Sequence, residues 1–333
     1  GRMNHEGDGP ERGTSKRQER RSIEVWGENL VEEMARMADI AEQYVYVALD
    51  TQFPGPVARP MGPFNEFLEY HWATMKCILG LTKVLQISFT FCDPKGNRPK
   101  GISTWRFNFL HDPLTDLVAE DVVNDLRRTR NLDLHRHAQQ GIRPQRFAEL
   151  LLGTGLVLNE DVRWITYRGT STFDTRSMED GHPGRPSDPP WIVFSSLYDF
   201  GHLLMMVRGE PMPEEVGRFF EDLDLFFPSR CDVAKHLHRL QQHNNGPAPR
   251  SAQSILEAFF RLPDAVRRTA FDASAEEAEA AAAPAAAGSA QTALASASRG
   301  QRKPAEQPRP ERPERDARPK GAGKNGTEKG ARR

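Results

Sequence analysis

The pattern of apolar and polar residues first becomes regular at Ser22. From there to Gln43 the apolar residues recur every three or four positions, which predicts an amphipathic helix. The pattern then changes to a short apolar, β-branched and aromatic run, YVYVAL at 44–49, which predicts a buried strand. We expect this strand to end at Asp50, because the Phe-Pro-Gly sequence at 53–55 breaks regular structure shortly afterwards.

Two further strands are predicted to form a hairpin. After a helical pattern around 64–80, the runs VLQISFTF (84–91) and STWRFNF (103–109) have the composition and alternation of strands. The residues between them, DPKGNRPKG, are of the types that form turns. The sequence therefore predicts a β-hairpin in this region.

The second half of the chain alternates between helical and strand patterns. Residues 116–152 are predicted to be mostly helical, and WITY (164–167) and WIVF (191–194) are predicted strands. Further helices are predicted at about 197–208, 213–224, 232–242 and 251–269. Strands interspersed with helices indicate an α/β fold with a mixed central sheet flanked by helices.

Composition divides the 333 residues into a folded body and flanking segments. Residues 1–21 have no apolar periodicity, and after Phe271 the chain contains no Phe, Trp, Tyr, Ile or Val. Such segments bury too little apolar surface to offset the entropy of ordering them. We therefore expect one folded domain at 22–271, disordered segments at 1–21 and 272–333, and a disordered polar insertion at 168–190.

Charge and cysteine content exclude several classes of protein. The chain has 45 Lys and Arg against 46 Asp and Glu, but from Arg299 onwards the counts are 12 and 5, so a basic tail follows an acidic body. That tail is either a solvated extension or a source of salt-sensitive attraction to nucleic acid. No apolar run reaches the roughly 18 residues of a membrane span, so we expect no membrane partner. The 3 cysteines, Cys77, Cys92 and Cys231, lack the spacing of a disulfide scaffold or zinc ribbon, which favours a reducing compartment.

Two acidic residues in apolar surroundings are the candidate site residues. Asp50 follows a predicted buried strand, at an edge of the sheet where α/β proteins commonly build sites. Asp199 lies in VFSSLYDFGHLLMMV, where burial of a carboxylate is costly unless the group is paired or binds a metal. Each residue also has a structural explanation: Asp50 as the start of a turn, and Asp199 as a first-turn residue that interacts with a helix N-terminus.

Other conspicuous residues are interpreted as structural. The pairs His135/His137 and His236/His238 have i,i+2 spacing, so on helices their side chains face different ways and suit a metal poorly. The remaining apolar pairs and tryptophans are assigned to the core: Met205-Met206, Phe219-Phe220, Phe226-Phe227, Trp26 and Trp72.

The sequences around the two carboxylates resemble one known family. LDTQFPG (49–55) and LYDFGHL (197–203) are similar to segments of the Caf/Pop-type deadenylases, the exonuclease subunits of the Ccr–Not messenger-RNA decay complex within the RNase D-like, DEDD superfamily. Further similar blocks follow the same order: IEVWGENLVEEM (23–34), LQISFTF (85–91), TWRFNF (104–109), GIRPQRFAELLLGTGLVLNEDVRWITY (141–167) and LFFPSRCDVAKHL (225–237). The resemblance covers about 22–240, continues weakly through SILEAFFRL (254–262), and implies a ribonuclease H-like core.

The resemblance also implies a chemistry. In the family, four carboxylates hold two divalent metals, usually Mg²⁺ or Mn²⁺, for hydrolysis of poly(A) from its 3′ end. Asp50 matches the first carboxylate and Asp199 the third, so both are expected to be metal ligands and catalytic residues. The second position is Gln52, which keeps a carbonyl oxygen but lacks the charge. We expect the fourth Asp to be lost, because the nearest residues are Ser251 or Gln253 and the chain between the flanking blocks is short.

Two functions therefore stay open from the sequence. In the first, the chain is a poly(A)-specific 3′-to-5′ exoribonuclease that acts in mRNA deadenylation. In the second, it is a catalytically inactive or weakened paralogue that acts by binding, because losing one preorganised electrostatic contact costs about 10²-fold in rate. In both, the resemblance implies poly(A) RNA rather than DNA, a helical Ccr–Not scaffold subunit and a leucine-rich-repeat nuclease subunit as partners. It also implies localisation in the nucleus and cytoplasm.

Overall fold

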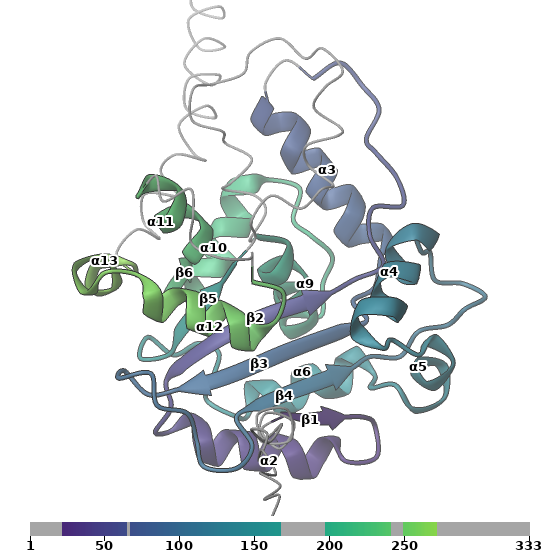
Figure 1. The fold of residues 1–333 in the computed structure, drawn as a ribbon. Coiled ribbons are helices and arrows are strands. Elements are labelled where there is room, and N and C mark those ends of the chain that lie inside the picture. Colours follow the sequence, from purple (N-terminus) through teal and green to yellow (C-terminus); the bar gives the residue numbers. More distant parts are fainter. Residues whose placement is uncertain (1–21, 65–66, 168–196, 241–248, 272–333) are drawn as a thin grey trace, which may run out of the picture. The chain divides into compact units, whose positions relative to one another are not determined.

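A computed structural model of the chain describes residues 22–64, 67–167, 197–240 and 249–271 (Figure 1). The predictions of disorder at 1–21, 168–190 and 272–333, and the predicted strand at 191–194, lie outside the described residues. None of the helices described there combines enough length with enough apolar character to cross a lipid bilayer.

Within the described residues, the centre of the fold is a mixed sheet of 6 strands in the order β1-β4-β3-β2-β5-β6. The strands are β1 (Ser22–Val25), β2 (Tyr46–Gln52), β3 (Gln86–Cys92), β4 (Thr104–Asn108), β5 (Arg163–Thr166) and β6 (Arg230–Asp232). β3 is antiparallel to β2 and β4, which confirms the predicted hairpin, whereas β1 is parallel to β4 and β5 is parallel to β2 and β6. The mixed sheet predicted from the sequence is therefore confirmed, and β2 lies in its interior.

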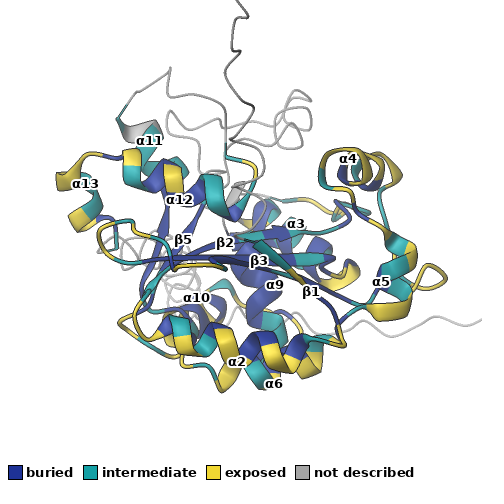
Figure 2. Cartoon of the chain, turned by 60° about the horizontal axis from the view of Figure 1, so that its bottom comes forward, coloured by how far each residue is buried: buried dark blue, intermediate teal, exposed yellow. Residues whose placement is uncertain are grey.

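Helices cover both faces of this sheet (Figure 1). They are α2 (Leu30–Ala41), α3 (Phe67–Leu81), α4 (Glu120–Arg130), α5 (Leu134–Gln140), α6 (Pro144–Leu152), α9 (Leu197–Arg208), α10 (Val216–Phe226), α11 (Val233–Arg239), α12 (Ala252–Arg261) and α13 (Asp264–Thr269). The larger apolar core joins α2, α6, α9 and α10 to one face, and a smaller core joins α12 to the other. Figure 2 shows the buried strands between these layers, with exposed residues on the outward sides of the helices.

The side chains of β2 alternate between these two cores. Val47 and Leu49 are fully buried in the larger core, whereas Ala48 belongs to the smaller core beneath α12. Successive side chains of a strand point to opposite faces of the sheet. Asp50 and Gln52 therefore share the face of Ala48, and Thr51 points to the side of the larger core.

The predicted helix between Ser22 and Gln43 is wrong at its start. Residues Ser22–Val25 form β1, which pairs with β4, and α2 begins only at Leu30. The Asn29 side chain accepts a hydrogen bond from the Trp26 backbone N–H at 2.8 Å, which fixes the turn between strand and helix. The apolar residues of this short segment fit both a strand and a helix, so pairing with β4 decides the outcome.

Other element boundaries also differ from the predictions. β2 does not end at Asp50, because its pairing with β3 continues to Gln52 opposite Gln86. The predicted helix at 251–269 is divided into α12 and α13 at Pro263, which has no backbone N–H to continue a helix. The strand β6 was not predicted, since a run of 3 residues is too short to show a period.

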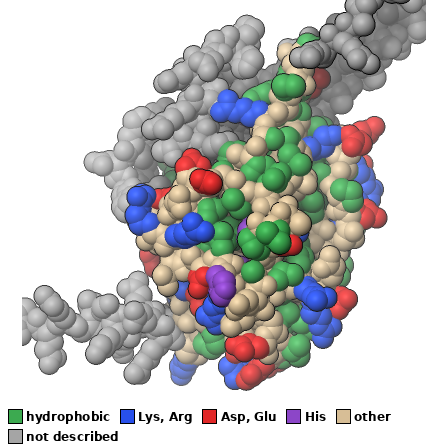
Figure 3. Space-filling model, turned by 90° about the vertical axis from the view of Figure 1, so that its right-hand side faces the viewer, with side chains coloured by type: hydrophobic (Ala, Val, Ile, Leu, Met, Phe, Trp, Pro, Cys, Tyr) green, Lys and Arg blue, Asp and Glu red, His purple; other side chains and the backbone are tan. Residues whose placement is uncertain are grey.

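The side of the molecule that carries α4 and α5 has a mixed surface (Figure 3). Hydrophobic side chains form a band through the middle of this face, and charged side chains lie in small groups around it. Lys and Arg lie beside Asp and Glu in several of these groups, and on α4 the Arg128 guanidinium is 2.6 Å from the Asp125 carboxylate. Among the described residues of this face, positive charge is therefore local rather than continuous.

Candidate functional site

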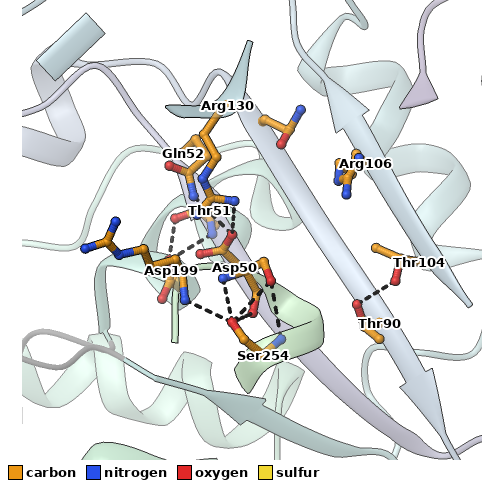
Figure 4. A network of polar contacts seen from close by, with 12 residues as sticks. Asp50, Thr51, Gln52, Thr90, Thr104, Arg106, Arg130, Asp199 and Ser254 are labelled. Carbon is orange, nitrogen blue, oxygen red and sulfur yellow. Dashed lines mark hydrogen bonds and ion pairs between the residues drawn. The ribbon is translucent and has the colours of Figure 1, made fainter. Parts of the chain in front are cut away.

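The candidate site begins at the carboxyl end of β2 (Figure 4). Asp50 pairs with Ser88 of β3 and Gln52 pairs with Gln86, so both site residues extend from an interior strand of the sheet. The side chain of Asp50 is 16% exposed, whereas Thr51 is buried on the other face. This strand end therefore presents a carboxylate and an amide on one face and a hydroxyl group on the other.

Asp199 meets this strand end from α9. It lies in the first turn of the helix and is 2% exposed. Its Oδ1 accepts a hydrogen bond from the Thr51 backbone N–H at 3.2 Å and a second one from the Thr51 hydroxyl group. Because Thr51 directly follows Asp50, these bonds bring the two predicted carboxylates to the same end of β2. Their roles as metal ligands and catalytic residues stay predictions.

Aromatic side chains hold the segment after β2 against α9. The ring of Phe53 stacks on that of Tyr198, with centroids 6.0 Å apart and planes inclined by 14°. The His202 ring, one helical turn later, lies 5.1 Å from the Phe53 ring. Phe53 and Tyr198 lie close in sequence to Asp50 and Asp199, so this packing supports the same juxtaposition as the Thr51 hydrogen bonds.

Side chains with positive or partly positive groups face Asp50, among them Gln52 and Arg130 (Figure 4). Gln52 Nε2 donates a hydrogen bond to Asp50 Oδ2 at 3.0 Å. Arg130 Nη1 lies 3.7 Å from the same oxygen. Gln52 thus turns its amide nitrogen toward Asp50, since its carbonyl oxygen would be repelled by the carboxylate. The negative charge of Asp50 is compensated by side chains of the chain itself.

Arg130 is the last residue of α4, far from β2 in the sequence. Leu126 of α4 and Leu132 beyond it pack with Leu85 in a small apolar cluster. The Leu85 N–H donates a hydrogen bond to the Gln52 carbonyl oxygen at 2.7 Å, which joins this cluster to the end of β2. Arg130 could not be predicted as a site residue from the sequence, because an arginine on a polar helix shows no local sign of a contact with another element.

The residues nearest to the family's fourth Asp have structural contacts at the start of α12. Ser251 is the N-cap of α12, and its hydroxyl group accepts a hydrogen bond from the Ser254 N–H at 3.3 Å. Gln253 Nε2 donates a hydrogen bond to Thr104 Oγ1 on β4 at 3.1 Å. The first residues of α12 therefore cap the helix and contact the sheet.

Several residues that were assigned to structure are indeed in the core. His137 is buried with Nδ1 2.7 Å from the Phe109 carbonyl oxygen, and burial lowers the pKa of its ring. His135, on the same helix, is exposed and contacts Gln139. The side chain of His238 lies outside the described residues. Of the residues predicted for the core, Trp26, Trp72, Phe219, Phe220 and Phe227 are buried. Met205, Met206 and Phe226 are only partly buried and pack against the core.

The side chains described here do not fit a centre for two divalent metals. Within the described ranges there is no group of at least 3 His, Cys, Asp or Glu side chains that could hold a metal ion. Asp50 and Asp199 supply carboxylates, but Gln52 directs its amide nitrogen at Asp50. The charge of Arg130 would also repel a cation bound to Asp50. The loss of the fourth carboxylate stays a prediction, because residues 241–248 lie outside the description.

Comparison with known proteins shows what this arrangement is similar to. No protein-family model matches the chain. The chain is 35% identical over 238 residues to the probable CCR4-associated factor 1 homolog 7 of Arabidopsis thaliana, covering 70% of this chain and 76% of that protein. It is 33% identical over 223 residues to the poly(A) ribonuclease pop2 of Schizosaccharomyces pombe, covering 67% of this chain and 58% of that protein.

Solved structures show the same similarity. The Mg²⁺- and Mn²⁺-bound form of S. pombe Pop2p matches with 32% identity and a TM-score of 0.58, covering 75% of this chain and 94% of that one. A structure of the yeast NOT1 MIF4G domain co-crystallised with CAF1 matches with 25% identity and a TM-score of 0.51, covering 67% of this chain and 73% of that one.

The mixed sheet, its flanking helices and the carboxylates at the end of β2 define a ribonuclease H-like α/β protein. Within that class, the chain belongs to the family of CCR4-associated factor 1 and Pop2. The family and the fold that the resemblance implied are therefore confirmed.

Proposed function

We propose that the chain acts in the removal of poly(A) tails from messenger RNA, as the Pop2-type subunit of a Ccr–Not complex. The observation that carries this proposal is the hydrogen bond from the Thr51 N–H to Asp199, because Thr51 is the residue next to Asp50 at the end of β2. Relatives named as poly(A) ribonuclease and CCR4-associated factor support the same assignment. The proposed ligand of the site is the 3′ end of poly(A).

We expect hydrolysis by this chain itself to be weak. Gln52 lacks the charge of the expected carboxylate, and Arg130 competes with any cation for Asp50. Each lost electrostatic contact typically costs about 10²-fold in rate, so two losses bring hydrolysis close to background. The proposed contribution is then to hold the RNA end and to assemble with partners, while a leucine-rich-repeat nuclease subunit supplies hydrolysis.

A trimming assay tests this division of roles. A labelled oligoadenylate is incubated with Mg²⁺ or Mn²⁺ and the unaltered chain, Asp50→Ala or Gln52→Glu. We expect trimming near background from the unaltered chain and an increase of up to about 10²-fold for Gln52→Glu. Gln86→Glu is the matched control, because it adds the same charge on the neighbouring strand, opposite position 52. Efficient trimming by the unaltered chain that Asp50→Ala abolishes would overturn the expected weakness.

Assembly is tested separately from hydrolysis. We expect the purified chain to bind the MIF4G domain of a NOT1 scaffold from the same organism, as the co-crystallised relative suggests. A failure to bind at micromolar concentration would contradict the proposed place in a Ccr–Not complex. The nuclear and cytoplasmic localisation stays a prediction, and imaging of a tagged chain tests it.

A further inference from the structure

We infer that Arg130 is a metal-independent anchor for the terminal phosphodiester of an RNA 3′ end at this site. The inference rests on the proposed function, because it assumes that the end of β2 receives RNA. It adds a binding residue outside the carboxylate pattern of Asp50, Gln52 and Asp199. The ligand chemistry is that of a phosphate group at the end of a single-stranded polymer.

The contact with Asp50 leaves the hydrogen-bond donors of the Arg130 guanidinium available. The separation of 3.7 Å is within ion-pair range but exceeds the roughly 2.7–3.2 Å of an N–H···O hydrogen bond. Within the described part of the chain, the Arg130 guanidinium forms an ion pair with Asp50. It donates no hydrogen bond to any described residue. The side chain is also 25% exposed. A ligand can therefore reach donors that the protein has oriented but not used.

Backbone hydrogen bonds at both ends of α4 fix the position of this helix and so of Arg130. At the start of the helix, the Ala119 N–H donates a hydrogen bond to the carbonyl oxygen of Pro54, just after β2, at 2.9 Å. At its end, Asn131 has a φ of 54° and its N–H bonds to the Leu126 carbonyl oxygen, so the helix stops directly after Arg130. The guanidinium is thus presented at the site by a helix that is tied to the end of β2.

The chemistry of a guanidinium suits this role better than that of a bound metal here. Its planar donors match two oxygens of a phosphate group, and its charge is permanent. Arg130 also compensates the charge of Asp50, so an incoming phosphate does not face an uncompensated carboxylate.

Binding of a fluorescent oligoadenylate to the full chain in EDTA tests the inference. We expect Arg130→Ala to weaken binding about tenfold, because a charge-assisted contact is lost. The slope of log affinity against log salt should become shallower by about 0.7, the value for one phosphate contact on a single strand. Arg130→Lys should restore part of the affinity, since it keeps the charge but not the planar donors. Arg128→Ala is the matched control on the same helix, and we expect it to bind as the unaltered chain does.

Competition separates a polymer end from a free anion. Unlabelled oligoadenylate should displace the probe at far lower concentration than inorganic phosphate does. Equal competition by inorganic phosphate would overturn the assignment to an RNA end. 

Direct titration with Mn²⁺ gives a second readout, in which Arg130→Ala is expected to raise an affinity rather than lower it. Arg130→Ala removes the charge that repels a cation from Asp50, so we expect this variant to bind Mn²⁺ more tightly than the unaltered chain. The added substitution Asp50→Asn should remove that gain. Weaker RNA binding together with tighter Mn²⁺ binding cannot arise from a loss of folding.

The outcomes distinguish this inference from the proposed function. If the unaltered chain binds no oligoadenylate even with Mg²⁺ or Mn²⁺ present, the proposed function fails. If it binds with these ions but not in EDTA, the metal-independent anchor fails and the proposed function stands. If it binds and Arg130→Ala behaves like Arg128→Ala, the inference alone fails and the proposed function stands.

Discussion

Thr51 supplies the buried carboxylate of Asp199 with hydrogen-bond donors that take the place of water. Its N–H and its hydroxyl group both donate to Asp199, whose surface is 2% exposed. An ionised carboxylate without such donors is destabilised by several kcal/mol when it is buried. The first-turn position in α9 adds an attraction to the helix N-terminus of about 0.3–1 kcal/mol. Two hydrogen bonds to the buried Asp199 carboxylate and the junction between α9 and β2 therefore both involve Thr51.

Replacement of Thr51 by Val tests this dependence. We expect Thr51→Val to lower the free energy of unfolding by about 1.5–3 kcal/mol, because the lost hydrogen bond is to a charged group. Thr90→Val is the matched control: Thr90 is equally buried on a neighbouring strand, and its hydroxyl group pairs with the neutral Thr104 hydroxyl at 2.9 Å. That loss should be about 0.5–1.5 kcal/mol. Urea unfolding measures both, and a loss for Thr51→Val no larger than for Thr90→Val contradicts the argument.

The residues of the candidate site differ in how well the sequence predicts their position and contacts. Asp50 and Asp199 could be found because each is an acidic residue in an apolar run. A carboxylate in such a place needs a hydrogen-bond donor, an opposite charge or a metal ion in place of water. Gln52 could be named as a position but not as the donor that faces Asp50. Arg130 could not be found, because its contact with Asp50 depends on how the end of α4 packs beside the end of β2. No residue close to Arg130 in the sequence shows this packing.

At the level of elements, α4 approaches the segment after β2 so closely that Gly55 has no room for a side chain. Gly55 has a φ of +83°, and a Cβ built on it would lie 2.6 Å from Val122 Cγ2. We expect Gly55→Ala to destabilise the fold by about 1–2 kcal/mol through its backbone and by about 1–3 kcal/mol through the clash. It should also weaken oligoadenylate binding, because α4 carries Arg130.

Gly101 is a matched control for this prediction. Its φ of +90° is similar, but nothing lies within 4 Å of a Cβ built there. Gly101→Ala should therefore show the backbone cost alone and leave oligoadenylate binding unchanged. Thermal unfolding and the EDTA binding assay measure the two effects. Equal destabilisation by both substitutions would show that α4 adjusts to the added methyl group.

Elements with a strong local signal were predicted well. The hairpin of β3 and β4 was found because turn residues separate two alternating runs, and α9 was found because its apolar run is long. β1 and β6 were missed because 4 and 3 residues carry too little pattern, and they become strands by pairing with neighbours. Long-range pairing, rather than propensity, decides such short elements.

At the scale of the whole molecule, the buried histidines make the fold sensitive to acid. His71, His111 and His137 are each at most 9% exposed. Burial lowers the pKa of His71 from 6.5 to about 4, and burial is also the main cause that lowers the pKa of His111 and of His137. The unfolded chain therefore takes up protons at these rings at a higher pH than the folded chain does. A difference in bound protons of this kind makes stability depend on pH.

The sign follows from the direction of these shifts. Above about pH 6.5 the rings are neutral in both states, so their full contribution to stability is present. As the pH falls from about 6.5 towards 4, the unfolded chain binds protons that the folded chain excludes, and His71 alone lowers the free energy of unfolding by up to about 1.4 kcal/mol per pH unit. Urea unfolding at about pH 7 and about pH 5 should show this loss. His71→Gln should make it smaller, whereas substitution of the exposed His135 by Gln should not change it. A free energy of unfolding that stays constant or rises towards pH 5 would mean that these rings are charged inside the fold, and that the packing around α3 and α5 differs from the one described.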